Sequence, residues 1–295
     1  MELRNIKTFA RIAEVGSFTR VATELGYTQS AVTMQVKQLE RELGCVLFER
    51  LSRSVRLTPE GERLLPVANR MLQAADEASR IAQKPGEVSG TLRIGVSDSL
   101  LVGVLAPVLS ELSRTYPRVC ASTHQQMPDE QFAMLRRNDI DVLLLLDERM
   151  ERPEWVKVFE VPAEVGFVAA ATDPLARRTK VPLEEVLSRP LFLTERDVSY
   201  RTGLDERIWA RGLEATPRVE CGNTAFLAEL VEGCGGVSFL PSCAVRAAVA
   251  AGRLAHVDVD FERLDLWHQA IVRKNKVMTP QMRLFLELVQ RELCK

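Results

Sequence analysis

Apolar side chains near the N-terminus recur at helical spacing in three short segments, residues 3–14, 18–25 and 29–43. A glycine follows each of the last two segments, at points where a residue that turns the chain readily is needed. Thr28 is placed to cap the third segment. The pattern therefore predicts two helices that meet across a tight turn, with the first segment as a helix that supports them.

The polar face of the third segment carries side chains suited to reading base edges in a DNA major groove. Gln can bond adenine edges, Ser and Thr can bond several bases, and an apolar side chain can touch a thymine methyl group. We therefore expect a helix-turn-helix that binds DNA, although spacing alone also fits an ordinary amphipathic helix pair. The residues on this face are Gln29, Ser30, Thr33, Met34, Lys37 and Arg41.

Two short segments after Gly44, LFER and SVRLT, predict a two-stranded wing. Arg50 and Arg56 flank the loop between these strands, residues 51–54, and Arg53 lies within it. Arginine side chains on such a loop can reach phosphates or a minor groove. The wing thus extends the predicted DNA-binding surface.

A longer helix is predicted from Pro59 to Gln83, with Thr58 as its cap. Its apolar positions alternate at spacings of four and three, which is typical of a coiled-coil seam that packs on a second subunit or on its own chain. Pro66 is expected to cost a hydrogen bond or to bend the helix. The segment KPGEVSG, residues 84–90, predicts a linker. The seam consists of Leu64, Ala68, Met71, Ala75, Ala78 and Ala82.

From Thr91 onward, short apolar strands alternate with helices, which predicts an α/β domain around a parallel sheet. The first set of strands contains TLRIGVSD, CASTHQQ and IDVLLLLD. The second set runs from VGFVAA through LFLT, RVEC and GVSFLP to HVDVD, and the strand AIVR follows. Helices are expected over residues 104–116, 128–136, 223–232 and 280–293, and around Ile208.

Composition narrows the class of protein. The 295 residues are 46% hydrophobic and 27% charged, as expected for two or three globular domains. The formal net charge is −1, so any DNA contact must come from a local patch. Residues 1–90 contain 13 Lys and Arg against 11 Asp and Glu, an excess of the right sign. No apolar run reaches the ~18 residues of a membrane helix and no signal-peptide core occurs, so we expect a cytoplasmic protein without a membrane partner.

Cysteine and histidine residues give no sign of a metal site or of an enzyme. The cysteines, scattered without a CxxC pair, are interpreted mostly as small buried hydrophobes, with Cys234 as the candidate exposed thiol. The histidines lack metal-ligand spacing and are expected on strands. No GxSxG, P-loop or GxGxxG motif occurs, so neither an enzyme nor a cofactor is predicted. The residues are Cys45, Cys120, Cys221, Cys234, Cys243, Cys294, His124, His256 and His268.

The N-terminal segment contains, in order, GSF, TQSAVT, LERELG, LFER and LTPEG. With this series it resembles the winged helix-turn-helix of LysR-type transcriptional regulators. The remainder resembles the effector domain of the same family, which is similar to the periplasmic binding proteins, through LRIGVSDS, RTYPRV, IDVLLL and GVSFLP. The resemblance covers nearly the whole chain. It implies an α+α/β architecture of a winged helix-turn-helix, a long linker helix and a two-lobed α/β effector domain.

The resemblance also implies the domain limits and the function. Residues 1–58 are expected to bind DNA, and residues 59–90 to form the dimerisation helix and hinge. The first lobe is expected over 91–161 and 267–295, and the second over 162–266. The family implies a bacterial homodimer or homotetramer, joined through the linker helix and effector domains, that binds double-stranded promoter DNA. A small-molecule effector between the lobes is expected to modulate this binding, as activator or repressor.

By resemblance, the first turns of the predicted recognition helix read bases and the wing arginine makes a further contact. Two residues depart from the family pattern: Val21 replaces a usual Ala, and Met34 replaces a frequent Arg. The second departure affects the base preference. The predicted DNA contacts are Thr28, Gln29, Ser30, Thr33, Met34, Lys37, Arg50 and Arg53.

A ligand site is expected where the first strand of the effector domain ends, just before a helix. Open α/β sheets bind ligands there, and helical N–H groups favour anions, although helix capping by Ser and Asp explains the same residues. Arg201 suits a carboxylate, whereas Asp98 opposes a strongly anionic ligand. With Pro128 at the rim, the predicted effector contacts are Ser97, Asp98, Ser99, Met127, Ser199, Tyr200, Arg201, Asn223 and Thr224.

Two alternatives to an effector-controlled regulator stay open at this point. Cys221, Cys234 and Cys243 all fall in the expected second lobe, so a regulator of the same family could sense oxidants through a pair of thiols. A protein of a different class, binding a small molecule without any regulatory role, would have the same lobes. Deletion of residues 1–58 distinguishes a regulator from such a binding protein, because a regulator would lose DNA binding and keep ligand binding.

Overall fold

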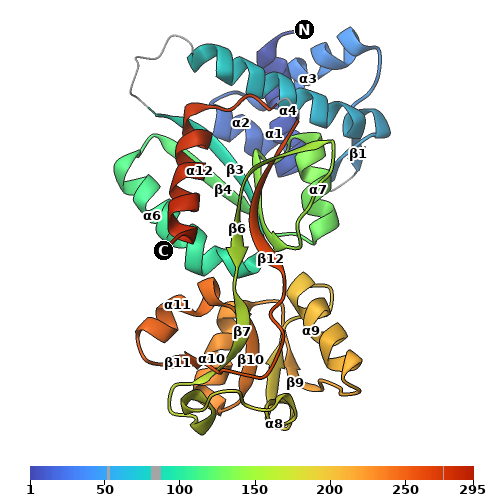
Figure 1. Cartoon of the computed structure of the whole chain (residues 1–295). Coiled ribbons are helices and arrows are strands. Elements are labelled where there is room, and N and C mark those ends of the chain that lie inside the picture. The colour runs from blue at the N-terminus through green and yellow to red at the C-terminus, as the bar shows by residue number, and fades with distance from the viewer. Residues whose placement is uncertain (52–53, 81–87, 275) are drawn as a thin grey trace. The chain divides into compact units, whose positions relative to one another are not determined.

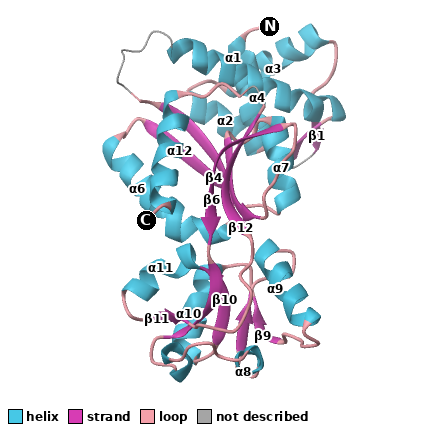
Figure 2. Ribbon diagram, viewed as in Figure 1, coloured by secondary structure: helices cyan, strands magenta, loops and turns pink. Residues whose placement is uncertain are grey.

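The computed structural model describes residues 1–51, 54–80, 88–274 and 276–295 (Figure 1). The chain divides into a smaller N-terminal unit and a larger unit that begins at Val88. In the described residues, the smaller unit has one two-stranded sheet and the larger unit has two five-stranded sheets with helices beside them (Figure 2).

The three predicted N-terminal helices are confirmed as α1 Leu3–Val15, α2 Phe18–Leu25 and α3 Gln29–Leu43. The glycine after each helix adopts the left-handed conformation, with φ of 68°, 70° and 71° respectively. This conformation costs other residues about 1–2 kcal/mol, so glycine ends each helix at little cost. Thr28 caps α3 as predicted, because its hydroxyl accepts a hydrogen bond of 3.2 Å from the N–H of Ala31.

A small aromatic core holds these helices together. Phe9, Ile12 and Leu39 are fully buried. The ring of Phe48 lies 5.4 Å from that of Phe9 and 5.6 Å from that of Phe18, measured between centroids. Since Phe48 begins the wing, this core also fixes the wing against the helices.

The predicted wing is an antiparallel pair, β1 Phe48–Leu51 and β2 Ser54–Leu57. The long helix α4 follows over Pro59–Arg80, and the N–H of Gly61 donates to the Thr58 hydroxyl at 3.0 Å, which confirms the predicted cap. The predicted end of this helix and most of the linker fall on residues 81–87, outside the described part.

The first half of the predicted seam packs within its own unit. Ala68 is buried, and Leu64 and Met71 pack on the aromatic core. The helix passes through Pro66 without interruption. An apolar stripe that starts by covering its own core leaves only its later turns for a second subunit.

The two sheets of the larger unit define two lobes. Lobe I contains β3 Gly90–Val96, β4 Val119–His124, β5 Val142–Asp147, β6 Trp155–Ala163 and β12 Leu266–Arg273. Lobe II contains β7 Val165–Ala170, β8 Leu191–Leu193, β9 Pro217–Glu220, β10 Val237–Pro241 and β11 Leu254–His256.

Both sheets are mixed, which corrects the prediction of a parallel sheet. The strand orders are β4-β3-β5-β12-β6 in lobe I and β11-β7-β10-β8-β9 in lobe II. In lobe I, β12 is antiparallel to both β5 and β6, and in lobe II β7 is antiparallel to β10 and β11. The reason is the path of the chain. Strand β6 leads out of lobe I and β12 returns to it, so these two strands pair in opposite directions.

Helices flank both sheets (Figure 1). Lobe I has α5 Asp98–Leu100, the π-helix η1 Leu101–Leu105, α6 Ala106–Thr115, α7 Pro128–Arg137 and α12 Pro280–Leu293. Lobe II has the 3₁₀ helix η2 Pro174–Arg177, α8 Leu183–Leu187, α9 Ser199–Ala210, α10 Thr224–Cys234 and α11 Ser242–Ala250.

Several elements differ from the sequence prediction. The helix expected over 104–116 begins at Asp98 and includes a π turn, whose wider period hides the apolar spacing. Strand β6, the short helices η2 and α8, and helix α11 were not predicted. The strand expected over 256–260 instead ends at His256, and Val259 forms only an isolated bridge with Val181.

All three histidines lie on strands, as predicted, and His268 on β12 is buried. Burial, with a smaller effect from the charge of Arg246, lowers the pKa of His268 to about 4. The folded chain therefore binds this proton more weakly than the unfolded chain, whose ordinary pKa is about 6.5. Folding stability is lost as the pH falls from about 6.5 toward 4, by about 2 kcal/mol at pH 5.

His268→Gln is therefore expected to reduce the loss of stability between pH 7 and pH 5 by about 2 kcal/mol, because glutamine does not titrate. Urea unfolding at the two pH values measures this difference. His256→Gln, at an exposed strand position, is the matched control and should keep the wild-type pH dependence. If the stability of the His268→Gln variant changed with pH as that of the wild type does, the lowered pKa of His268 would be contradicted.

Candidate DNA interface and ligand cleft

Helix α3 divides into a buried face and an open face. Val32, Val36 and Leu39 are buried against the N-terminal core. Among the predicted base-reading residues, Gln29, Ser30, Met34 and Lys37 are exposed and Thr33 is half-buried. Met34 has 69% of its surface exposed, which is unusual for an apolar side chain inside a helix. The open face thus presents both polar groups and a methionine to a groove.

Thr28 lies at the start of this face and orders its first turn. Besides capping α3, its hydroxyl lies 2.9 Å from the hydroxyl of Ser30. Arg50 lies in β1, paired with Val55. Arg53, the predicted wing contact, lies outside the described residues.

One contact that orients α3 was missed by the sequence analysis. The hydroxyl of the buried Thr8 donates to Oε1 of Gln35 at 2.6 Å, which ties α1 to α3. A threonine on the packing side of the first helix was the only available signal. Together with the burial of Val32, Val36 and Leu39, this bond holds the rotation of α3 about its axis, and so the direction of its open face.

A cavity of about 510 Å³ lies between the two lobes. Such a volume suits a small organic ligand. The structure brings together there seven of the nine predicted effector contacts, and Pro128 with them. These seven residues are Ser97, Asp98, Ser99, Met127, Ser199, Tyr200 and Thr224.

Asp98 joins the lobes across this cleft. Its Oδ2 accepts hydrogen bonds from the backbone N–H of Thr224, at 2.8 Å, and from the Thr224 hydroxyl, at 2.9 Å. Thr224 begins α10, so a carboxylate of lobe I caps a helix of lobe II. The Ser199 hydroxyl makes a second bridge, donating to the carbonyl oxygen of Leu146 at 3.1 Å.

Arg201 does not line the cavity, which corrects its predicted role as a ligand contact. It is 1% exposed, and its Nε donates to the carboxylate of Asp205 at 2.9 and 3.0 Å. A terminal nitrogen donates to the carbonyl oxygen of Thr194 at 2.5 Å and to Glu220 at 3.3 Å. Arg201 comes directly after Tyr200, which lines the cleft, on helix α9. The side chain of Arg201 therefore points into lobe II.

Asn223 also lies outside the cavity lining, because it performs a local task. Its Oδ1 accepts a hydrogen bond of 2.8 Å from the N–H of Phe226 and thereby caps α10. The first turn of α10 is therefore capped twice, by Asn223 from its own chain segment and by Asp98 from the other lobe.

Several lining residues were missed by the sequence analysis. Asp147 is the last residue of β5, at its carboxyl end, so the rule that selected Ser97 could have found it. Gln131 reaches the cleft from α7 and is held by a bond of 3.0 Å from Nε2 to the carbonyl oxygen of Val96. Further lining residues are Phe132, Leu143, Leu145, Leu146, Glu195 and Asp197.

Burial shifts the protonation of two groups at the cleft. Desolvation raises the pKa of the Asp147 carboxyl above its usual range, and the Glu148 N–H, bonded to it at 2.8 Å, partly opposes this effect. Burial also raises the pKa of the Tyr200 hydroxyl, with a smaller contribution from Asp98. Tyr200 is therefore a neutral hydroxyl at the edge of an acidic cavity.

All six cysteines are free thiols, and most are not buried, so the interpretation of them as buried hydrophobes is wrong for most of the set. Cys234 is exposed as predicted, as are Cys120 and Cys294. Only Cys243 is buried, and desolvation raises its pKa to about 11. Cys243 thus remains protonated near neutral pH, which disfavours reaction with oxidants at this position.

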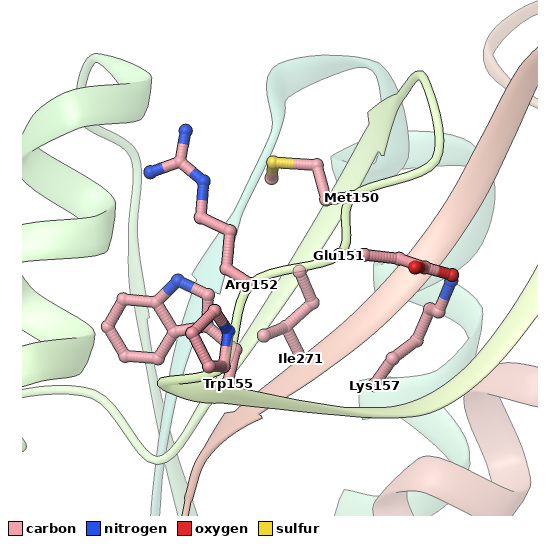
Figure 3. A pocket seen from close by; sticks show the side chains of 7 residues that line it. Met150, Glu151, Arg152, Trp155, Lys157 and Ile271 are labelled. Carbon is pink, nitrogen blue, oxygen red and sulfur yellow. The ribbon is translucent and has the colours of Figure 1, made fainter.

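A second cavity, of about 350 Å³, lies in lobe I beside β6 and β12 (Figure 3). Trp155 and Ile271 contribute apolar surface, and the side chain of Arg152 extends next to the indole of Trp155. Lys157, on its rim, is paired with Glu160 at 2.5 Å. Because this cavity belongs to one lobe, a ligand in it would not connect the lobes.

Neither a metal site nor a membrane helix is found in the part of the chain that the structure describes. No group of three or more His, Cys, Asp or Glu residues there is arranged to hold an ion. None of its helices has both the length and the apolar character to cross a membrane.

Comparison with known proteins covers both units. Residues 3–62 match the bacterial regulatory helix-turn-helix of the lysR family, and residues 85–294 match the LysR substrate binding domain. The chain is 30% identical over 293 residues to the uncharacterized HTH-type transcriptional regulator YwqM of Bacillus subtilis, covering 99% of each sequence. It is 28% identical to the HTH-type transcriptional regulator CzcR of Bacillus anthracis, covering 98% of this chain and 97% of that protein.

Two solved structures share the fold at low identity. A full-length OxyR variant from Pseudomonas aeruginosa, with one cysteine replaced by aspartate, has a TM-score of 0.72 and 21% identity, covering 99% of this chain and 94% of that one. Full-length CbnR in complex with its target DNA has a TM-score of 0.66 and 23% identity, covering 99% of this chain and 100% of that one.

Proposed function

Because this chain belongs to the LysR family of transcriptional regulators, we propose that it binds a promoter through the open face of α3 and is controlled by a small molecule in the interlobe cleft. The family consists of regulators, not enzymes, with a DNA-binding helix-turn-helix and an effector-binding domain. The acting form is a homodimer or homotetramer bound to double-stranded DNA. Two recognition helices related by two-fold symmetry would then lie about 34 Å apart, or a multiple of it, on one face of the DNA.

The observation that carries the effector part of this proposal is the bridge between Asp98 and Thr224. A ligand in the cavity touches residues of both lobes at the point where they are already hydrogen-bonded. Binding there changes the relative stability of the lobe arrangements. A coupling of about 1–3 kcal/mol between ligand and DNA would change promoter occupancy several-fold.

The thiol-based alternative has less support. Of its three candidate thiols only Cys234 is exposed, whereas Cys243 is buried and has a raised pKa, and Cys221 is half-buried. Attack on an oxidant requires an accessible thiolate. The effector mechanism needs no thiol chemistry and uses the cavity that the fold provides.

Gln29→Ala is expected to weaken binding to the operator about tenfold or more, and to relax base choice at one position, because a good bidentate base contact discriminates by about 1–3 kcal/mol. DNA footprinting upstream of the protein's own gene, with a two-fold protected site, supplies the target for the titration. The salt dependence should stay unchanged, since no phosphate contact is lost.

Gln38→Ala is the matched control, because it makes the same substitution at an exposed position beyond the edge of the reading face of α3. It should bind the operator nearly as the wild type does. Equal affinities for the Gln29→Ala variant and the wild type on every operator position would refute the assigned reading face. A complete lack of protected DNA at low salt, even with cell metabolites added, would mean that the target lies elsewhere or that α3 is only structural, and would favour a ligand-binding protein without regulation.

A further inference from the structure

The charged side chains that line the interlobe cleft all carry the same sign. Four carboxylates line it, from Asp98 and Asp147 in lobe I and from Glu195 and Asp197 in lobe II, and no Lys, Arg or His does. Across the described residues, no cationic side chain forms an ion pair with any of the four. Arg201, the nearest candidate by sequence, is instead paired with Asp205 and Glu220.

One of these carboxylates already has its partners. Asp98 accepts both hydrogen bonds of Thr224 and lies at the positive end of α10. The other three lack an equivalent. Asp147 accepts the Glu148 N–H at 2.8 Å, and its raised pKa shows that burial outweighs this bond. Asp147 is half-buried, and an ionised carboxylate in such a partly desolvated place is costly unless a cation pairs with it. Glu195 and Asp197 are exposed, and they add negative charge to the lining without this desolvation.

Helix N-termini do not cancel this negative charge. Helix α7 begins at Pro128 and helix α9 at Ser199, both on the cleft, and each N-terminus corresponds to only about half of a positive charge, against three carboxylates. The N-terminus of α10 is already capped by Asp98 and Asn223. The net field in the cleft therefore disfavours a carboxylate or phosphate ligand and favours a cation.

The remaining lining is apolar. Leu143 and Leu145 face the cavity from β5, Phe132 faces it from α7, and Met127 lies beside them. Such a wall suits a hydrocarbon stem, and an aromatic ring can also face a cationic head group. Gln125, Gln126 and Gln131 add amide oxygens that can accept hydrogen bonds.

We propose that the interlobe cleft binds a small organic cation, a primary amine or guanidine on an apolar stem, through Asp147 of lobe I and Glu195 and Asp197 of lobe II. This assignment rests on the proposed function, in which the cleft is the effector site. The assignment also explains how the ligand would change the arrangement of the two lobes. Like charges on the two lobes repel each other, and a cation between them converts that repulsion into attraction and favours lobe closure.

The test measures thermal unfolding of the full chain, without DNA, during titration with two cations and two anions of similar size. The cations are agmatine and phenethylamine, and the anions are glutarate and 3-phenylpropionate. At least one cation is expected to raise the Tm with concentration, and neither anion should do so. In the Asp147→Asn variant, the apparent Kd for that cation should increase about tenfold or more.

Glu229→Gln is the matched control, because it removes one carboxylate from α10 at a site that is 73% exposed and outside the cavity. It should bind the cation as the wild type does, which excludes attraction to the general surface charge. The assignment is overturned if neither cation raises the Tm, if an anion raises it more than the cations do, or if Asp147→Asn binds the cation as tightly as the wild type.

These outcomes remain distinct from failure of the proposed function. An anion that raises the Tm and also alters the operator footprint would remove the charge assignment while leaving an effector-controlled regulator. A cation that binds through Asp147 while the chain protects no DNA would leave the ligand assignment and remove the regulatory function.

Discussion

Gly103→Ala is expected to destabilise the larger unit by about 3 kcal/mol or more, at the upper end of the usual cost of overpacking. The added Cβ would lie 1.8 Å from the carbonyl oxygen of Cys243 and 2.6 Å from its carbonyl carbon. Both are backbone atoms, so no side-chain rotation can relieve the overlap. The π-helix η1 and helix α11 must therefore move apart.

This displacement would also reach the cleft. Cys243 donates its Sγ–H to the carbonyl oxygen of Ser99 at 3.7 Å, and Ser99 lines the cavity next to Asp98. Loss of packing between η1 and α11 should thus weaken both the fold and ligand binding. Chemical denaturation of the full chain, followed by near-ultraviolet circular dichroism, measures the first effect.

Gly233→Ala provides a control of opposite sign. Gly233 lies in α10, and an added Cβ would meet nothing within 4 Å. Alanine is favoured over glycine in helices, so this variant should be stabilised by up to about 1 kcal/mol. A Gly103→Ala variant as stable as the wild type would show that η1 and α11 do not pack as closely as described.

Arg201→Met is expected to destabilise the larger unit by about 2–3 kcal/mol, because it removes the guanidinium from a buried set of charge-assisted bonds. Asp205 and Glu220 would lose their cation, and the carbonyl oxygen of Thr194 would lose its donor. The cost stays below that of a fully buried pair, since the side chains of Asp205 and Glu220 are 32% and 40% exposed and can regain water.

Urea unfolding of Arg201→Met beside Arg218→Met measures this effect. Arg218 is an exposed arginine on β9, and its substitution should change stability by less than about 0.5 kcal/mol. If Arg201 were instead a ligand contact, its substitution would abolish ligand binding and leave stability unchanged. The two variants therefore separate a structural arginine from a binding one.

The sequence was sufficient where the information is local. The ends of α2 and α3 follow from Gly26 and Gly44, which adopt φ of 70° and 71°, and the start of α3 follows from the Thr28 cap. Apolar spacing of about 3.6 residues identified the buried face of α3, and so its open face. These features depend on residues within one or two turns of each other, which is why they can be read without the fold.

Helices and strands were harder to predict where the spacing of apolar residues was unusual. The π turn at Leu101–Leu105 changed the helical period, and the alanine-rich helix α11 has little polar contrast between its faces. The two chain crossings between the lobes reversed β6 and β12 relative to each other. None of these features has a strong local pattern.

The residues of the cleft also divide into those that the sequence identified and those whose contacts only the tertiary structure showed. Ser97, Asp98 and Ser99 were identified from the sequence because the carboxyl end of a strand in an α/β sheet is a general ligand position. Only the tertiary structure decided that Asp98 bonds Thr224, 126 residues away, and that Arg201 turns into lobe II toward Asp205 and Glu220. Local spacing sets which elements form, whereas the direction of a long side chain depends on charges and packing contributed by distant segments.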